Sequence, residues 1–259
     1  MTANNDSITI AVAALNEEHD LKQAVDIVVR SVERHFETYE VLVFNDGSTD
    51  RTGEIADALA AQYLHVRAIH HDQPKCLGGV IRSGLEQARM NYFMWVDGKG
   101  ATTEAALDRI FSLRGQADLV VPYPCNQHLR SWPRRVVSRA FVTLLNLLFQ
   151  LNLPYYTHVV LCRTQLARRF AIRTNSYAYQ AEALIKMIRS GCSYVSVAVE
   201  DRYDFDDRRT KAFRWNNVVR VARFLMQTFW NVHLTGDGRR AKRGVKKSAT
   251  PAMHVSLKE

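Results

Sequence analysis

The sequence has no long uninterrupted apolar run, and this absence limits how the protein can relate to a membrane. The nearest run, residues 141–153, is interrupted by Asn146, Gln150 and Asn152. It is shorter than the roughly 20 apolar residues that a helix needs to cross a bilayer. The first residues, M-T-A-N-N-D-S, also lack the positive segment and apolar core of a secretory signal. We therefore expect a cytoplasmic protein without a transmembrane span, either soluble or peripheral on the cytoplasmic face of a membrane.

Cysteine is also sparse, and its placement excludes two further classes of protein. The four cysteines have no metal-ligand spacing, and nothing indicates a disulfide framework. By contrast, 47% of the residues are hydrophobic, which is enough to bury a proper core and excludes a disordered chain. The cysteines are Cys76, Cys125, Cys162 and Cys192.

Acidic residues become scarce toward the C-terminus, so the net charge of +9 is unevenly placed. Residues 201–259 hold 14 of the 35 Lys and Arg residues but 6 of the 26 Asp and Glu residues. A basic flank attracts anionic lipid, phosphorylated ligands or nucleic acid. For residues 236–247 we favour the plainer interpretation, a solvated and partly disordered tail.

Apolar runs of strand length alternate with helical segments over the first hundred residues or so. Strand, helix and strand at this spacing predict an α/β fold, a Rossmann-like and mostly parallel sheet with helices on both faces. The predicted strands are 7–14, 41–45, 64–70 and 92–96, and the predicted helices are 20–36, 53–62 and 79–90.

Polar side chains gather where three of the predicted strands end. The clearest case is 39–52, Y-E-V-L-V-F-N-D-G-S-T-D-R-T, in which an apolar run leads directly into an acidic turn with glycine. Open parallel sheets bind ligands beyond the carboxyl ends of their strands, so we expect a nucleotide pocket there. A turn with a helix cap would explain one such strand end, but three are harder to explain in this way. The residues are Asn16 and Glu17, Asp46 and Ser48, and Asp97 and Lys99.

On these residues the sequence resembles a family 2 glycosyltransferase with the GT-A fold. Within that family it is most similar to the dolichol-phosphate mannosyltransferase or polyprenyl-phosphate glycosyltransferase group, over roughly residues 7 to 228. The resemblance implies an inverting hexosyltransferase that moves a sugar from a nucleoside diphosphate to a polyprenyl phosphate. The similar segments are A-A-L-N-E-E at 13–18, V-F-N-D-G-S-T-D-R-T at 43–52, L-G-G-V-I-R-S-G-L-E-Q-A-R at 77–89, F-M-W-V-D-G at 93–98, S-R-A-F-V-T-L-L-N-L-L-F-Q-L-N-L at 138–153, Y-A-Y-Q-A-E-A-L at 177–184 and T-K-A at 210–212.

The same resemblance divides the chain into three parts. Residues 7–212 would form the GT-A glycosyltransferase domain. Residues 213–234 show apolar and basic positions at helical spacing, which predicts an amphipathic helix that lies in a membrane interface or packs on the domain. Residues 235–259 would be the basic, disordered tail.

For the donor, the resemblance implies that the first two strand ends hold the nucleoside. Glu17 and Asp46 would accept hydrogen bonds from ribose and base, and Asn16 would shape the turn. Arg82 would reach a phosphate, unless it is simply a surface arginine, and Lys75 is a weaker candidate. The expected donor site is Asn16, Glu17, Asp46, Ser48, Gly78 and Arg82, with Gly79 and Gly84 also allowing the backbone to approach a ligand closely.

The third strand end departs from the family pattern, which commonly has Asp-x-Asp where this chain has Asp97 and Lys99. In one interpretation Asp97 holds Mg²⁺ or Mn²⁺ together with the diphosphate and water. In the other, Lys99 replaces the metal charge and neutralises the departing diphosphate itself. We favour a retained but weakly bound metal, and both residues are expected catalytic groups.

The acceptor side is expected after Val121, where Pro122 and Pro124 predict a loop. A helix beginning near Pro133 would place Arg135 and Arg139 on one face, which suits an anionic acceptor such as a lipid phosphate, although an exposed basic helix is the plainer interpretation. The apolar run 141–153 would pack on the core or lie at a membrane interface. Further acceptor-side groups implied by the resemblance are Glu182, as base or orienting group, and Arg209 and Lys211, in a charged loop that would close over the diphosphate.

Two alternatives remain open from the sequence. One keeps the fold but transfers the sugar to a sugar hydroxyl, as in polysaccharide assembly. The other is a non-catalytic nucleotide-binding or nucleic-acid-binding protein that uses the basic tail, which salt-sensitive DNA binding without sugar-nucleotide hydrolysis would support. The nucleotide base, the sugar and the oligomeric state are not fixed by these residues.

Overall fold

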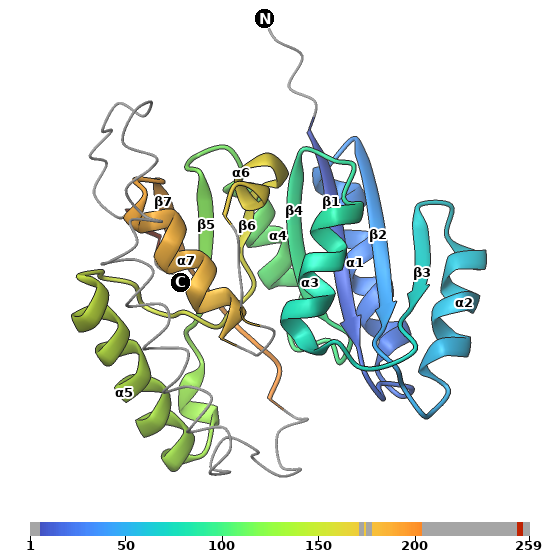
Figure 1. Ribbon diagram of the computed structural model, residues 1–259, viewed down its shortest axis with the longest axis horizontal. Helices are drawn as coiled ribbons and strands as arrows, with labels where there is room; N and C mark the ends of the chain where they lie inside the picture. Colours follow the sequence, from blue (N-terminus) through green and yellow to red (C-terminus); the bar gives the residue numbers. More distant parts are fainter. Residues whose placement is uncertain (1–5, 171–173, 175–177, 204–252, 256–259) are drawn as a thin grey trace, which may run out of the picture.

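The computed structural model describes residues 6–170, 174, 178–203 and 253–255, and one sheet organises them (Figure 1). The strands are β1 (Ser7–Ala14), β2 (Thr38–Asn45), β3 (Val66–His70), β4 (Tyr92–Asp97), β5 (Leu119–Pro124), β6 (Leu161–Arg163), β7 (Tyr194–Val199) and β8 (Met253–Val255). The helices are α1 (Leu21–His35), α2 (Thr52–Gln62), α3 (Cys76–Gln87), α4 (Glu104–Ser112), α5 (Trp132–Phe149), α6 (Thr164–Arg168) and α7 (Tyr179–Arg189), with a short 3₁₀ helix η1 (Gln127–Leu129) before α5.

The strands lie in the order β3-β2-β1-β4-β6-β5-β7-β8. Only β6 runs against its neighbours among these strands, pairing antiparallel with both β4 and β5. Since the other pairs are parallel, β1, β2, β4, β5 and β7 all end at the same edge of the sheet. Functional groups that follow these strands are therefore brought together by chain direction alone.

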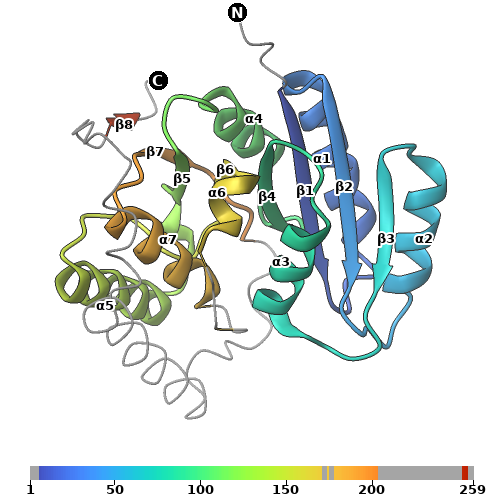
Figure 2. The same cartoon turned by 45° about the horizontal axis from the view of Figure 1, so that its top comes forward.

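The core lies between the sheet and a layer of helices on each face. α1, α2 and α4 contact one another or their strands on one face, and α3, α6 and α7 cover the other (Figures 1 and 2). β1 is buried along its length except for Ala13, as expected for a strand covered on both faces. Leu21, Val25, Val28 and Val32 recur at helical spacing and form the buried face of α1.

The structure confirms the predicted α/β class and the elements predicted in the first part of the chain. The predicted strands correspond to β1, β2, β3 and β4, and the predicted helices correspond to α1, α2 and α3. The third helix begins earlier than predicted, at Cys76. The predicted helix near Pro133 is also present as α5, with the proline in its first turn.

The predicted loop at Pro122 and Pro124 is wrong, because both prolines lie inside β5. Proline has no N–H and fits a strand only where that amide would have no partner. Within β5, only Leu119 and Val120 pair with β6, so the following residues of β5 face no described strand on that side. The amide of Cys125, the next residue after Pro124, donates to β7, so the proline nitrogens face the open side.

The apolar run in α5 packs on the core in part, and its place at a membrane interface stays a prediction. Leu145 and Phe149 are fully buried against the core, whereas Leu147 is 77% exposed and Trp132 is 68% exposed. Among the described residues, no helix is both long and apolar enough to cross a bilayer. The predicted helix 213–234 lies outside the described residues, as does the tail 235–259 except for β8, which pairs with β7.

Gly84 allows α3 to pack closely on the sheet, and replacing it tests this contact. A Cβ at Gly84 would lie 2.9 Å from the Cβ of Ala11 and 3.3 Å from the ring of Phe93. We expect Gly84→Ala to lower the free energy of unfolding by about 1–3 kcal/mol, because overpacking outweighs the better helix propensity of alanine. Urea denaturation measures the change, with Ser83→Ala on the same helix as the control. Unchanged or higher stability of Gly84→Ala would contradict the close packing.

Candidate active site

The end of β1 and the turn after β2 hold each other in place through Asn16. Asn16 has a positive φ of 56°, a conformation that asparagine tolerates better than most residues. Its backbone N–H donates to Ser48 Oγ at 3.0 Å, and its Oδ1 accepts from the Thr49 N–H at 2.8 Å. Asn16 therefore bonds directly to the turn after β2, and the Ser48 hydroxyl accepts one of these bonds.

Glu17, Asp97 and Lys99, predicted from two different strand ends, are electrostatic neighbours. The Glu17 N–H donates to Thr52 Oγ1 at 2.8 Å, which holds the residue at the end of β1. The pKa of Glu17 is raised to about 7, mainly by burial; Lys99 opposes the rise, and the nearby charge of Asp97 contributes to it. A carboxyl with such a pKa lies close to its change of charge at neutral pH.

Asp97 ends β4 and is held by the loop that follows it. Its Oδ1 accepts from the Ala101 N–H at 2.9 Å. Burial raises the pKa of the Asp97 carboxyl above its usual range, and the charge of Lys99 acts in the opposite direction. Gly98 sits tightly against the end of β1, since a Cβ there would lie 3.1 Å from the carbonyl oxygen of Ala13. The structure thus places a carboxyl and a lysine within electrostatic range of each other at the end of β4; their contact with a diphosphate stays a prediction.

Asp46 is the most deeply buried of the predicted donor residues that have a polar side chain. It is 4% exposed, and its Oδ1 lies 2.7 Å from His71 Nδ1 and accepts from the Lys75 N–H at 2.9 Å. These contacts tie the segment after β3 to the end of β2. Recognition of a ribose or base by Asp46 stays a prediction. Since Oδ1 has two partners already, Oδ2 would be the oxygen that accepts from the ligand. Sequence reasoning missed His71, because nothing local marks it as the partner of a strand-end carboxylate.

The glycines of α3 differ in role, and Arg82 is not a simple surface residue. Gly84 serves helix–sheet packing rather than ligand approach, and a Cβ on Gly79 would meet the side chain of Lys75 at 2.6 Å. Gly78 is buried in the first turn of the helix. Arg82 is partly buried, and its charge acts on the Tyr179 hydroxyl of α7. A phosphate contact by Gly78 or Arg82 stays a prediction.

Sequence reasoning missed His158 and Asp201, which lie within electrostatic range of Asp97. Asp201 follows β7 and forms a β-bridge with Thr102, in the loop after Asp97. His158 Nε2 lies 3.0 Å from Asp201 Oδ1, and these two side chains are 7% and 8% exposed. Both are close enough to act on the ionisation of Asp97. They come from distant parts of the chain, so no local pattern could have paired them.

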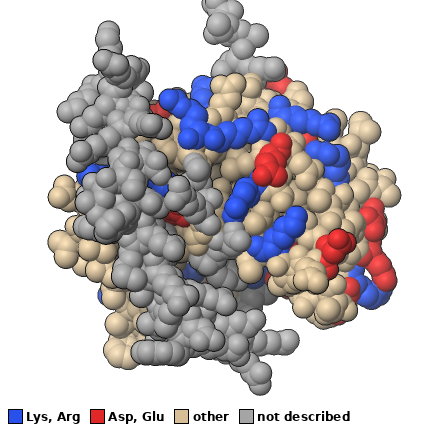
Figure 3. Space-filling view, viewed as in Figure 1, with Lys and Arg blue, Asp and Glu red and all other residues tan. Residues whose placement is uncertain are grey.

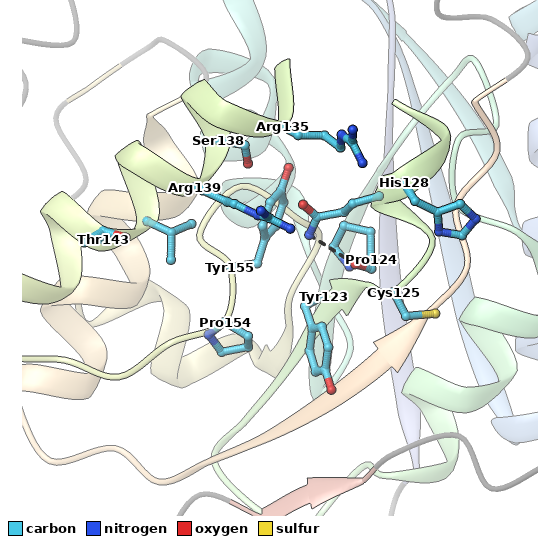
Figure 4. Close-up of a pocket in the computed structure, with 12 residues that line it drawn as sticks. Tyr123, Pro124, Cys125, His128, Arg135, Ser138, Arg139, Thr143, Pro154 and Tyr155 are labelled. Carbon is cyan, nitrogen blue, oxygen red and sulfur yellow. Dashed lines mark hydrogen bonds between the residues drawn. The ribbon is translucent and has the colours of Figure 1, made fainter. Parts of the chain in front are cut away.

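A cavity of about 630 Å³ adjoins this edge, between α5 and the end of β5 (Figure 4). Arg135 and Arg139, four residues apart, extend into it from the same face of α5. No Asp or Glu is among the described residues that line it, so its charge is positive. Asn126 beside the cavity donates to the Asp201 carbonyl at 2.8 Å, which connects the cavity to the strand-end groups.

The remaining predicted acceptor-side residues have mixed outcomes. Glu182 is buried, pairs with Lys186 Nζ at 2.7 Å and accepts from the Thr174 N–H at 3.1 Å. Its role as base or orienting group stays a prediction. Arg209 and Lys211 lie outside the described residues.

The described groups fit a divalent cation only if the substrate supplies other ligands. No group of three or more His, Cys, Asp or Glu side chains able to hold a metal occurs in the described part of the chain. The strand-end edge does offer the Asp97 carboxyl. Near it, the buried imidazole nitrogen His158 Nδ1 has no hydrogen-bond partner. A hard cation accepts one or two protein ligands when phosphate oxygens and water complete its shell.

Comparisons with known sequences agree with this geometry. Residues 9–172 match the family described as "Glycosyl transferase family 2". Glycosyltransferase AglD of Haloferax volcanii is 26% identical over 247 residues, which cover 89% of this chain and 38% of that protein. The undecaprenyl-phosphate mannosyltransferase of Micrococcus luteus is 26% identical over 219 residues, covering 80% of this chain and 88% of that protein. The chain spans 29% to 38% of the length of the first three curated relatives it matches.

A comparison with solved structures finds the same fold. The crystal structure of glucosyl-3-phosphoglycerate synthase from Mycobacterium tuberculosis, in complex with Mg²⁺ and UDP, matches with a TM-score of 0.61. The match is 16% identical and covers 87% of this chain and 79% of that chain. At this identity the likeness shows the fold alone, and it confirms the expected GT-A-like α/β class.

The raised pKa of Glu17 predicts a pH-dependent effect of Glu17→Gln on stability. The folded protein holds this pKa at about 7, above the ordinary 4.5, so Glu17 costs stability progressively as pH rises from about 4.5 to about 7. Glutamine resembles the protonated form. We therefore expect Glu17→Gln to raise the Tm at pH 8 and to leave it nearly unchanged at pH 4.5.

Thermal unfolding at both pH values measures the effect, with the exposed Glu37→Gln as the control for loss of one negative charge. A Tm that falls in Glu17→Gln at pH 8 would show that Glu17 is stabilised as a carboxylate, contrary to the burial argument.

Proposed function

Since residues 9–172, more than half of the chain, match glycosyltransferase family 2, the chain belongs to that family, and we propose that it transfers a sugar from a nucleoside-diphosphate sugar to a polyprenyl phosphate. The observation that carries the proposal is the adjacency of two unlike sites. A carboxylate-bearing strand-end edge suits the donor, and a positively charged cavity beside it suits an anionic acceptor.

The donor half of the proposal rests on the strand-end residues. Glu17 and Asp46 offer carboxylate oxygens to the hydroxyls of a ribose or the N–H groups of a base. The structural neighbour from Mycobacterium tuberculosis was solved with UDP and Mg²⁺, and another structure of that enzyme with UDP-glucose and Mn²⁺. These complexes support a nucleoside-diphosphate sugar as donor in general, and the base and sugar are for experiment to identify.

The acceptor half rests on the arginines of α5. Planar guanidinium groups bind phosphate through paired hydrogen bonds, and Arg135 and Arg139 supply two of them to one cavity. Two relatives have names that refer to such acceptors, the undecaprenyl-phosphate mannosyltransferase and a dolichyl-phosphate beta-glucosyltransferase of the mouse, 29% identical over 124 residues.

The proposed reaction is a single displacement with inversion. An oxygen of the polyprenyl phosphate forms a bond to the anomeric carbon while the bond from that carbon to the nucleoside diphosphate breaks. Bound Mg²⁺ or Mn²⁺, with Asp97 among its ligands, would neutralise the departing diphosphate. Lys99, exposed beside Asp97, would add positive charge as the diphosphate leaves, and the protein otherwise positions the two reactants.

The alternative acceptor, a sugar hydroxyl, is less well supported by the geometry. A hydroxyl must lose a proton during attack and needs a general base, whereas a phosphate is already ionised. Glu182, the residue expected to act as base, is buried and paired with Lys186. The non-catalytic alternative depends on the basic tail, most of which lies outside the described residues. The described part of the face in Figure 3 carries both signs of charge.

α5 also supports attachment to an anionic membrane surface, where a polyprenyl phosphate is found. The helix contains three arginines and no acid, and it exposes Trp132, Leu144 and Leu147. We expect Leu147→Glu to reduce binding to vesicles that contain anionic lipid by about tenfold, because apolar area is lost and a repelled charge is added. Vesicle sedimentation measures the binding. An unchanged Tm of the variant checks that the substitution has left the folded core intact. Equal sedimentation of both proteins would contradict the role of α5.

Arg139→Gln tests the acceptor cavity. Losing charge-assisted hydrogen bonds to a phosphate is expected to raise the KM for the polyprenyl phosphate about tenfold or more while leaving the KM for the donor unchanged. Arg134→Gln is the matched control, because Arg134 lies on the same helix but does not line the cavity. Equal changes in the two variants, or a change in the donor KM alone, would contradict binding of the acceptor in this cavity.

The function itself is tested by transfer of a radiolabelled sugar. The full chain is incubated with vesicles containing undecaprenyl phosphate, Mn²⁺ and a panel of UDP- and GDP-sugars. Label extracted with the lipid supports the proposal. Label transferred only to a saccharide acceptor supports the hydroxyl alternative, and no transfer or hydrolysis of any donor, with salt-sensitive DNA binding, supports the non-catalytic one.

A further inference from the structure

A buried imidazole nitrogen without a hydrogen-bond partner lies at the strand-end edge. His158 stands between α5 and β6, and its side chain is 7% exposed. Its Nδ1 is buried and makes no hydrogen bond. Buried polar atoms are nearly always bonded, so an unpartnered one calls for an explanation such as an ion or a ligand.

The other ring nitrogen of His158 is fixed by a carboxylate. Nε2 lies 3.0 Å from Asp201 Oδ1, and since a carboxylate only accepts, the proton is assigned to Nε2. Nδ1 of the neutral ring then carries a lone pair. This is the arrangement of most metal-binding histidines, which donate their second N–H to a carboxylate or carbonyl.

Asp201 is itself held firmly next to the loop that carries Asp97. Its N–H donates to Asn126 Oδ1 at 3.2 Å, and it bridges to Thr102. The next residue, Arg202, donates its N–H to the Ala101 carbonyl at 2.9 Å. The pair of His158 and Asp201 is therefore built into the same strand-end structure as Asp97, whose ionisation both side chains affect.

We propose that His158 Nδ1 is a direct ligand of the divalent cation that accompanies the donor, with Asp97 as the carboxylate ligand and Asp201 as the group that orients the imidazole. This rests on the proposed function for the donor half of the site. It resolves the absence of a second acid at Lys99, because the missing oxygen ligand is replaced by a nitrogen from a distant segment. One nitrogen and one carboxylate, completed by diphosphate oxygens and water, suit Mn²⁺ well.

The competing role for His158 is that of a protonated ring that donates to the diphosphate. In that state Nδ1 carries a proton and has no lone pair for a metal. The two roles therefore differ in one observable, a direct bond between the metal and an imidazole nitrogen.

The experiment is pulsed electron paramagnetic resonance of Mn²⁺ bound to the full chain, with UDP or GDP present. Mn²⁺ bound to imidazole shows a hyperfine coupling to ¹⁴N. We expect this coupling in the unchanged protein, its loss in His158→Ala and its retention in His128→Ala, which removes an imidazole from the neighbouring cavity. Asp201→Asn is expected to weaken Mn²⁺ affinity about 10- to 100-fold, the range for groups that orient a metal ligand.

The unchanged protein alone decides the main point, so a variant that fails to fold does not leave the question open. Bound Mn²⁺ without nitrogen coupling, or coupling that survives in folded His158→Ala, overturns the inference. Nucleoside diphosphate that binds equally well with and without Mn²⁺ also overturns it but leaves the glycosyltransferase proposal standing. Failure of every nucleoside diphosphate and sugar nucleotide to bind, with or without Mn²⁺, would overturn both.

Discussion

The site depends on the burial of carboxyl groups at one edge of the sheet, where they are poorly solvated. Glu17 and Asp97 both have a raised pKa, and in both cases burial is the main cause. The charge of Asp97 also raises the pKa of Glu17, since like charges at short range repel. Lys99 offsets part of this cost of ionisation. In the proposed function, a divalent cation held beside these carboxyls would offset more of it.

The constraint is imposed by chain direction and reinforced by long-range contacts. Parallel pairing brings the ends of β1, β2 and β4 together, and the bridge from Thr102 to Asp201 adds the end of β7. Asn126 then connects Asp201 to the rim of the cavity under α5. The strand-end edge and the cavity are therefore neighbours, as the proposed in-line displacement requires.

The sequence revealed the parts of the fold that local patterns determine. Continuous apolar runs marked β1, β2 and β4, and the polar residues after them led to Asn16 and Asp97. β5 was missed because a local rule against proline in strands was applied without knowing that β6 is short. His71, His158 and Asp201 were missed for a different reason. Each is placed at the site by a hydrogen bond to a residue far away in the sequence. The same limit applies to Glu182, whose burial against Lys186 is not visible in the pattern that singled it out.

The central claim is that the strand-end edge holds a nucleoside-diphosphate sugar. A crystal structure of the full chain with a bound sugar nucleotide and Mn²⁺ tests it most directly. The account predicts density for the nucleoside beside Glu17 and Asp46 and for the diphosphate beside Asp97, with the sugar directed toward the cavity that Arg135 and Arg139 line. Density for the nucleotide at any other surface, with this edge filled only by side chains, would contradict it.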